Sequence, residues 1–420
     1  MGIRRIAVLC VHTSPLASLG GSKTGGMNVY VREFAKEMGK RGVQIDVFTR
    51  RGDSDAPDVD HSLGDNVRVV YVSAGPPLPL DPMSVYPHLS QFTAGVIAFA
   101  TRHAMNYDLI YSHYWLSGWV AQKLKEVWHV PFVHMFHTLG HMKHRIGAGK
   151  MLLPDVRIAT ETQIVNWASR IIAATPAEHN QLLWLYRADR RKIAIIPPGV
   201  DVRHFQPVSA TEARRRLGLD EKCDVLLFVG RIEPLKAVDT ILEAVDLINH
   251  EQHDWLECVN VAVIGGDPNN PNDHELSRLQ HLAKELNLED VVKFLGAKDH
   301  KLLPLYYAAA TTVIMPSDYE SFGMVALESM ASGTPVIASE VGGLAFLVHD
   351  QQTGFLVPSR DPVALAGGII ALLSDPEKRE LLGRNAIALA QQYTWTIIVD
   401  RLVELFEDVV SRPAINRHRR

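Results

Sequence analysis

Short apolar runs alternate with amphipathic stretches along the first half of the chain. In one such stretch, Tyr30, Phe34 and Met38 recur at the spacing that puts side chains on one face of a helix. The apolar runs are short enough to be buried strands, and the predicted strands are Ile6–Val11, Gln44–Phe48, Val67–Val72, Leu109–Ser112, Phe132–Phe136, Ile171–Ala174 and Ile193–Ile196. Strands that alternate with helices are typical of an α/β fold with a mostly parallel, doubly wound sheet.

A break in this alternation follows the last of these strands. Two prolines and a glycine stop regular structure, so we interpret Pro197–Pro207 as a linker between domains. The alternation then restarts, with predicted strands at Asp224–Val229, Val259–Ile264, Val291–Leu295, Thr311–Met315 and Pro335–Ala338. We predict two Rossmann-like domains, residues 1–200 and 201–394, that face a central cleft. A last helix at about 395–411 is expected to cross back to the first domain.

Composition and charge narrow the class of protein. A chain of 420 residues is too long for one compact core, and its 47% hydrophobic and 21% charged residues are typical of soluble globular proteins. A net charge of −4 argues against nucleic-acid binding. No apolar run reaches membrane-spanning length, and Ile6–Val11 is too short for a signal peptide. Three distant cysteines, Cys10, Cys223 and Cys258, suit a reducing compartment without a metal site, so we expect a cytoplasmic protein.

The segment from Glu320 to Glu328 is the most informative candidate site. Gly323 is predicted to start a helix, where free N–H groups favour a phosphate. Glu328, more than a turn further along, would be placed to hydrogen-bond a ribose diol, and Glu320 would lie in the preceding loop near a sugar. The alternative is an ordinary exposed helix with two solvated acids.

Two further loops carry features suited to phosphates. Arg231 offers a planar fork and Lys236 a point charge, which together can clamp a diphosphate; the alternative is a surface charge pair. The glycines of Gly20–Asn28 let backbone approach a ligand, with a flexible turn as the alternative. This stretch matches neither the dinucleotide fingerprint nor the Walker A loop, which lowers the NAD-dependent oxidoreductase and ATPase interpretations.

The first domain has two loops of another kind. Ser112–Trp115 follows a strand and can line a cleft, although its tryptophan could equally pack beneath a domain interface. His137 and Thr138 follow the next strand, with Lys143 and Arg157 further on. A single histidine there is often structural, but these neighbours favour a polar, cationic pocket for a hydroxylated or phosphorylated acceptor.

Together these motifs resemble the retaining glycosyltransferases of family 4, which have the GT-B fold. In the second half, the resemblance rests on Gly230-Arg231 with Lys236, the pair Glu320 and Glu328, Ser332–Pro335, Gly342-Gly343 and Thr353-Gly354. In the first half, it rests on His12–Leu16, Gly25–Val31, Ser112–Gly118 and His137–Leu139. The first-half motifs are similar to the D-inositol-3-phosphate glycosyltransferases of mycothiol synthesis, and the sucrose-phosphate and mannosylfructose-phosphate synthases are related groups. The resemblance spans nearly the whole chain.

The resemblance implies transfer of a hexosyl unit, with retention, from a nucleoside diphosphate sugar, expected to be UDP-linked, to a small polyol or sugar phosphate such as inositol 3-phosphate. The second domain would bind the donor and the first the acceptor. Catalytic residues would be His137, Arg231, Lys236 and Glu320; donor-binding residues Gly25, Gly26, Arg231, Lys236, Phe322, Gly323, Met324 and Glu328; acceptor-binding residues Asn28, Tyr114, Thr138, Lys143 and Arg157. Partners would be small molecules, with no nucleic acid and no membrane; a homodimer is left open.

The resemblance also implies how these groups act. His137 would contact the donor sugar near its 6-hydroxyl, Glu320 would hold the 3- and 4-hydroxyls, and Glu328 the ribose. Arg231 and Lys236 would stabilise the leaving diphosphate, so no metal site and no cofactor is expected, and Mg²⁺ would at most accompany the released product. No placed nucleophile is evident, so front-face attack by the acceptor is the expected route.

Two positions depart from the family pattern. Ala237 stands where a glycine usually follows the lysine, with little consequence expected. Pro77–Leu89 contains no lysine or arginine, although the inositol-phosphate enzymes place a phosphate-binding lysine there. Transfer to fructose 6-phosphate, or to an unphosphorylated or lipid acceptor, therefore stays open. A nucleotide-sugar 2-epimerase and a two-lobed binding protein are alternatives outside the transferases.

Overall fold

The computed structural model describes residues 2–17, 25–146, 156–251, 258–270 and 273–411. It divides into two compact units. The first unit contains Met1–Ala17, Gly26–Pro197 and Trp395–Arg420, and the second contains Ser18–Gly25 and Pro198–Thr394. Within the described residues, the chain thus passes between the units at Gly25 and Gly26, at Pro197 and Pro198, and at Thr394 and Trp395.

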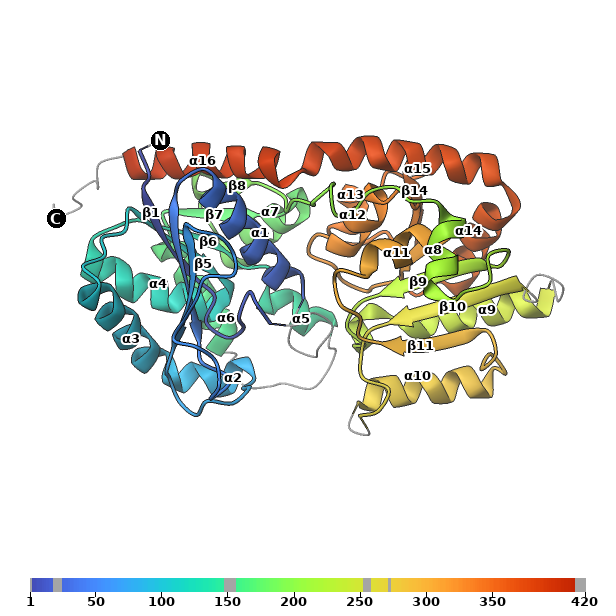
Figure 1. Cartoon of the computed structure of the whole chain (residues 1–420), viewed down its shortest axis with the longest axis horizontal. Helices are drawn as coiled ribbons and strands as arrows, with labels where there is room; N and C mark the ends of the chain where they lie inside the picture. The colour runs from blue at the N-terminus through green and yellow to red at the C-terminus, as the bar shows by residue number, and fades with distance from the viewer. Residues whose placement is uncertain (1, 18–24, 147–155, 252–257, 271–272, 412–420) are drawn as a thin grey trace. The chain divides into compact units, whose positions relative to one another are not determined.

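The sheet of the first unit is parallel except at one edge. Its strand order is β3 (Val59–Asp60), β4 (Val67–Val72), β2 (Gln44–Arg50), β1 (Arg5–Leu9), β5 (Leu109–His113), β6 (Phe132–Met135), β7 (Arg170–Ala173) and β8 (Ile193–Ile195). Only β3 pairs antiparallel, with β4. The helices are α1 (Gly26–Lys40), α2 (Pro82–Val85), α3 (Leu89–Arg102), α4 (Tyr114–Trp128), α5 (Gly140–Ile146), α6 (Val156–Trp167), α7 (Pro176–Tyr186) and α16 (Trp395–Ser411). In Figure 1, α3 and α4 lie on one side of this sheet and α1 on the other.

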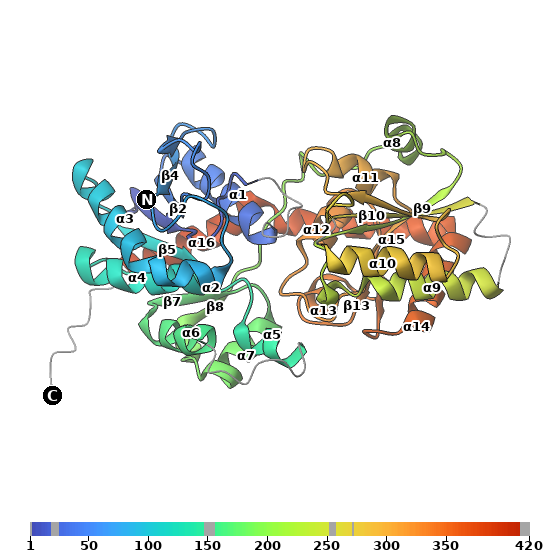
Figure 2. The same ribbon diagram turned by 90° about the horizontal axis from the view of Figure 1, so that it is seen from below.

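The second unit has a wholly parallel sheet. Its strand order is β11 (Val292–Gly296), β10 (Val259–Ile264), β9 (Asp224–Val229), β12 (Thr312–Met315), β13 (Val336–Ser339) and β14 (Gly354–Val357). The helices are α8 (Ala210–Leu217), η3 (Pro234–Lys236), α9 (Val238–Glu251), α10 (His274–Glu285), α11 (Leu303–Ala309), α12 (Met324–Ala331), α13 (Leu344–Leu347), α14 (Pro362–Ser374) and α15 (Pro376–Ala390). Figure 2 shows α9 and α10 on one side of this sheet and α11 on the other.

These elements confirm the predicted α/β class, and each predicted strand is present within one or two residues of its expected bounds. The predicted return of the last helix is confirmed too, because the Phe406 ring of α16 packs edge-on against Phe34 and Tyr111 of the first unit. The sequence prediction lacked β3 and β14. Among the described helices, none is both long and apolar enough to cross a bilayer.

The cysteines depart from the sequence expectation. Cys223 and Cys258 form a disulfide with Cα atoms 4.4 Å apart, whereas Cys10 is a buried free thiol. The two bonded residues directly precede β9 and β10, neighbouring parallel strands. A disulfide does not suit the reducing compartment inferred from cysteine number and spacing.

Candidate functional site

Two strands of the first unit end in left-handed turns at bulky residues. Tyr114, directly after β5, has φ of 72°, and His137, shortly after β6, has φ of 62°. Side chains with a Cβ rarely adopt this conformation, and such outliers cluster at functional sites. Both lie at the carboxyl edge of the parallel sheet, where ligands of this architecture bind.

The His137 imidazole is half-buried and hydrogen-bonded to a second histidine. Its Nε2 lies 2.9 Å from Nδ1 of His113, the last residue of β5. Desolvation, and to a lesser extent the neighbouring His12, lowers the pKa of His137 to about 3. The ring is therefore neutral near pH 7 and can exchange hydrogen bonds with a sugar hydroxyl without carrying charge.

Three of the predicted acceptor residues meet in one cluster. Nη2 of Arg157, on α6, donates to the Thr138 carbonyl at 2.7 Å and to its hydroxyl at 3.0 Å. Its Nη1 donates to the Tyr114 hydroxyl at 3.2 Å, and the guanidinium lies 4.9 Å from the centre of that ring. The structure thus brings Tyr114, Thr138 and Arg157 together, as a site for an anion would require.

Glu161 completes this cluster and was not predicted from the sequence. Its carboxylate, fully buried, accepts from Nε of Arg157 at 2.7 Å, from the Gly140 amide at 2.9 Å and from the Tyr186 hydroxyl. Arg157 and Glu161 are four residues apart on α6, the spacing at which side chains of a helix meet. That spacing is the signal that could have found it.

The other two predicted acceptor residues differ in position. Lys143 is exposed on α5. Desolvation, and then the charges of Arg157 and Lys143, lowers the pKa of half-buried His12 to about 3. The His12 ring packs 4.4 Å from that of Tyr114.

Asn28 is buried in α1, and its amide donates to the Thr13 hydroxyl at 2.8 Å and the Ser14 carbonyl at 2.7 Å. Asn28 therefore supports the loop after β1.

Arg50, a buried cation, lies against the segment that lacks a lysine. It ends β2, and its guanidinium donates to the carbonyl groups of Pro76 at 2.8 Å and Leu78 at 2.6 Å. Burial lowers its pKa. Within the described part of the chain, no carboxylate forms an ion pair with Arg50. The sequence prediction missed it because Arg50 is 26 residues from Pro76.

In the second unit, the predicted donor cations each contact a carboxylate. Lys236, at the end of η3, forms an ion pair with Glu320 in the loop after β12. Arg231 forms one with Glu233 at 2.6 Å, and these two side chains are 34% and 33% exposed. Solvent screens partly exposed pairs, so an incoming diphosphate can replace the carboxylates at little cost.

The start of α12 has the features of an anion site. Gly323 has φ of 106° and provides no side-chain cap, so backbone N–H groups at the helix start remain available to a ligand. The preceding Phe322 is buried, and Met324, the first helical residue, is half-buried. Gly342 and Gly343 pack on this loop, since a Cβ at either would lie within 2.5 Å of backbone atoms of Glu320 or Phe322. Their place in the motif is thus explained by close packing.

Glu328 is held within α12 by two side chains. The buried Tyr307 hydroxyl donates to its Oε2 at 2.8 Å, and Nε2 of His300 lies 3.4 Å from its Oε1. Burial, and then the Glu328 charge, raises the pKa of Tyr307 well above its usual value, so the phenol stays a donor. Glu328 is therefore a fixed acceptor of hydrogen bonds and not a solvated surface acid.

The glycine-rich loop is described only at its end. Residues 20–24 lie outside the described residues, Gly25 groups with the second unit, and Gly26 begins α1. A Cβ built on Gly25 would lie 3.8 Å from Nε of Arg231. In the described part of the chain, no group of three or more His, Cys, Asp or Glu residues is arranged to hold a metal ion.

Comparisons with known proteins cover both units. The family model described as Glycosyltransferase Family 4 matches residues 24–204, and that described as Glycosyl transferases group 1 matches residues 209–389. A D-inositol 3-phosphate glycosyltransferase of Kineococcus radiotolerans is 41% identical over 426 residues, which cover 99% of this chain and 98% of that protein. One of Geodermatophilus obscurus is 42% identical over 405 residues, covering 96% and 89%.

Solved structures match the fold over the same span. Sucrose-phosphate synthase from Thermosynechococcus elongatus superimposes with a TM-score of 0.88 and 34% identity, covering 97% of this chain and 99% of that one. HepE of Anabaena, in complex with UDP-glucose, has a TM-score of 0.75 at 21% identity, covering 96% and 99%, and supports the fold alone. The predicted GT-B fold is confirmed.

Proposed function

The chain belongs to the group 1 and family 4 glycosyltransferases, and we propose that it moves a hexosyl unit, with retention, from a UDP-linked sugar to a small phosphorylated polyol such as inositol 3-phosphate. The observation that carries the acceptor is the cluster around Arg157, in which the Tyr114 and Thr138 hydroxyls meet a buried guanidinium. Its relatives named D-inositol 3-phosphate glycosyltransferase match along almost the full chain.

The donor would bind to the loops of the second unit. Arg231 and Lys236 would contact the two phosphates, and the open start of α12 at Gly323 would receive one of their oxygens. Glu320 would hold the sugar hydroxyls, and Glu328, fixed by Tyr307, the ribose diol. Binding would replace the contact of Arg231 with Glu233 by a contact with phosphate.

Catalysis would depend on charge that develops as the donor breaks. When the bond between the anomeric carbon and the diphosphate oxygen lengthens, negative charge grows on the diphosphate, next to Arg231 and Lys236. The acceptor hydroxyl would attack from the same face, and the leaving phosphate would take its proton. His137, neutral and fixed by His113, would orient the donor sugar. With two cations in place, we propose that no bound metal is required.

An acceptor phosphate would meet a mixed charge environment. Glu161 already balances Arg157, so the exposed Lys143 would supply the further positive charge. The stretch Pro77–Leu89 has no lysine or arginine, but Arg50 holds the carbonyl group of Leu78 in this stretch. The positive charge of Lys143 favours a phosphorylated acceptor. The acceptor would have to be small, so that its phosphate lies close to Lys143.

The test is nucleotide release from UDP-, GDP- and ADP-sugars, with and without D-myo-inositol 3-phosphate, in the presence of EDTA. We expect UDP release that inositol phosphate stimulates and EDTA leaves intact, and an axial anomeric product by NMR for an α-linked donor. Release that needs added metal would contradict metal independence. Failure of every donor would contradict the transferase assignment.

Transfer to fructose 6-phosphate is the second candidate. The match to sucrose-phosphate synthase, at 34% identity and a TM-score of 0.88, favours it. Stimulation by fructose 6-phosphate and not by inositol phosphate, in the same panel, would replace the first candidate with the second. Donor hydrolysis that neither phosphate stimulates would indicate an unphosphorylated acceptor.

A further inference from the structure

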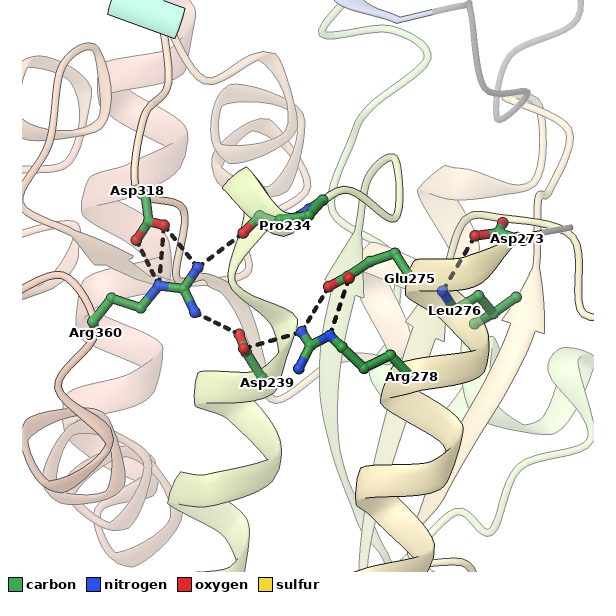
Figure 3. A network of polar contacts seen from close by, with 8 residues as sticks. All are labelled: Pro234, Asp239, Asp273, Glu275, Leu276, Arg278, Asp318 and Arg360. Atoms are coloured by element: carbon green, nitrogen blue, oxygen red, sulfur yellow. Dashed lines mark hydrogen bonds and ion pairs between the residues drawn. The ribbon is translucent and has the colours of Figure 1, made fainter. Parts of the chain in front are cut away.

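Figure 3 shows a network of polar contacts in the second unit, some of whose residues lie near the donor loops in the sequence. Its centre is Arg360, which follows β14 and precedes α14. Nε of Arg360 lies 2.8 and 3.0 Å from the two carboxylate oxygens of Asp318, and Nη2 lies 2.7 Å from the second of them. Nη1 donates to Asp239 at 2.9 Å, and Nη2 also donates to the carbonyl group of Pro234 at 2.9 Å. One guanidinium therefore joins three segments: the loop after β12, η3, and the adjoining first turn of α9.

Two of these segments carry residues proposed to act on the donor. Asp318 lies two residues before Glu320 in the loop after β12, and Pro234 opens the short helix η3 that ends at Lys236. The Asp318 amide also donates to the carbonyl group of Leu235 at 2.9 Å. Arg360 thus joins the bases of the two loops whose tips form the ion pair between Lys236 and Glu320.

The third segment is anchored from outside the loops. Asp239, in the first turn of α9, accepts from Arg360 through one oxygen and from Arg278 of α10 through the other, at 3.0 Å. Arg278 also binds Glu275 at 2.7 Å. Asp239 therefore holds one end of the Arg360 guanidinium through one oxygen, while its other oxygen binds Arg278.

The backbone at Arg360 supports a positioning role. It has φ of 58°, a left-handed conformation that costs energy for a residue with a Cβ and that persists where surrounding contacts enforce it. The side chain is 43% exposed, so screening limits what its ion pairs add to stability. The guanidinium instead fixes the relative positions of its partners, because its N–H donors point in fixed directions that a lysine cannot reproduce.

We propose that Arg360 is a positioning residue, which sets the separation of Lys236 and Glu320 through Asp318 and the carbonyl group of Pro234 and thereby controls turnover. The inference rests on the proposed function, because it assigns Lys236 and Glu320 to the donor. Among the described residues, Arg360 itself forms no hydrogen bond or ion pair with a residue proposed to bind the donor, so its loss acts through loop geometry. A displacement of about 1 Å in such a site can lower the rate roughly 100-fold.

The test compares Arg360→Met and Arg360→Lys with Arg278→Met. Arg278 is a matched control, since it belongs to the same network, is 47% exposed and, in the described part of the chain, forms ion pairs with Asp239 and Glu275 but with neither loop. We expect kcat for nucleotide release to fall about 10- to 100-fold in Arg360→Met and nearly as far in Arg360→Lys. The Kd for UDP should stay within about twofold of wild type, and Arg278→Met should keep kcat within about twofold.

A double-mutant cycle and hydrogen exchange separate positioning from a general structural effect. In a Glu320→Gln background, Arg360→Met should lower kcat little further, because both changes disrupt one arrangement. Exchange should rise in peptides that span Leu235 and Asp318 and not in those from α14. Multiplicative kcat effects, unchanged exchange, or a kcat loss equalled by Arg278→Met would each overturn the proposal. Wild-type protein that acts on no donor would instead overturn the proposed function and this inference together.

Discussion

The ion pairs at the candidate site residues are buried in the first unit and more exposed to solvent in the second unit. In the first unit, Arg157 and Glu161 form a pair whose side chains are 10% and 0% exposed. In the second unit, Lys236 and Glu320 form a pair at 18% and 17%, and Arg231 with Glu233 is more exposed still. A buried pair cannot separate without leaving an uncompensated charge, whereas a screened pair can exchange partners. The first unit is thus suited to fixed recognition, and the second to binding and releasing a charged ligand.

The largest expected effect comes from breaking the buried pair. Arg157→Met should cost about 3–5 kcal/mol of unfolding free energy, because Glu161 stays buried without its cation. Arg231→Met should cost less than about 1 kcal/mol. Urea unfolding of both variants measures the difference.

A double variant separates stability from binding in the first unit. Arg157→Met with Glu161→Gln removes both charges and should recover most of the unfolding free energy. Acceptor stimulation should remain lost, since the guanidinium is absent. Equal losses for Arg157→Met and Arg231→Met would contradict the contrast between the units.

Next in size is the effect on turnover of changing the pair between Lys236 and Glu320. Glu320→Gln should lower kcat about 10²- to 10³-fold, as loss of one placed electrostatic contact does, while UDP binds about as before. Glu380→Gln, which alters an exposed pair with Arg384 on α15, is the control and should leave kcat intact. Turnover of Glu320→Gln at the wild-type rate would remove Glu320 from the site.

The pH response should be concentrated in the first unit. Burial lowers the pKa of His12 and His137 to about 3, so each contributes stability above pH 6.5, and this is lost as pH falls towards 3, by about 1.4 kcal/mol per pH unit. Buried Glu178, whose pKa is raised to about 7, has the opposite effect, with stability that is lost as pH rises from 4.5 to 7. Melting curves at pH 7, 6 and 5 should therefore show falling stability.

Two variants show which residues cause this dependence of stability on pH. His12→Asn should flatten the loss of stability below pH 6.5, and Glu178→Gln should steepen it, because its opposing contribution disappears. A melting temperature that is unaffected by acid in all three proteins would contradict neutral imidazoles in the first unit.

The smallest effect concerns backbone strain beside Lys236. Ala237 has φ of 49°, which explains why a glycine is usual there. Ala237→Gly should relieve about 1–2 kcal/mol of strain and lose about 0.5–1 kcal/mol to glycine entropy and about 0.8 kcal/mol with its buried methyl, so stability should change by less than about 1 kcal/mol. Ala310→Gly, at an ordinary φ of −73°, has no strain to relieve and should lose more stability. Equal destabilisation by both changes in a thermal melt would show that Ala237 is not strained.

Sequence patterns located the strands because each central strand is an apolar run long enough to be buried on both faces. They missed β3, which has two residues at a sheet edge, and β14, where Gly354 weakens the strand pattern. The loops that follow the strands were located for the same reason, since ligands bind where parallel strands end.

Partners of the site residues were harder to predict. Glu161 was within reach, one helical turn from Arg157. Arg360 was not, because its partners Asp239 and Pro234 are 121 and 126 residues away. The disulfide was hidden for a similar reason, as the two strands that follow Cys223 and Cys258 were predicted but not their adjacency. Periodicity describes one element at a time, whereas these contacts depend on which elements become neighbours.

The disulfide offers a site for attaching a label to this protein. Cys258 is exposed, and both bonded cysteines lie at the amino ends of β9 and β10, the edge opposite the donor loops. Cys10 is buried, and burial raises the pKa of its thiol to about 12, so it stays unreactive. Mild reduction would therefore expose one accessible attachment point, at which a fluorophore or spin label could report on the second domain during turnover without touching the residues that carry it out.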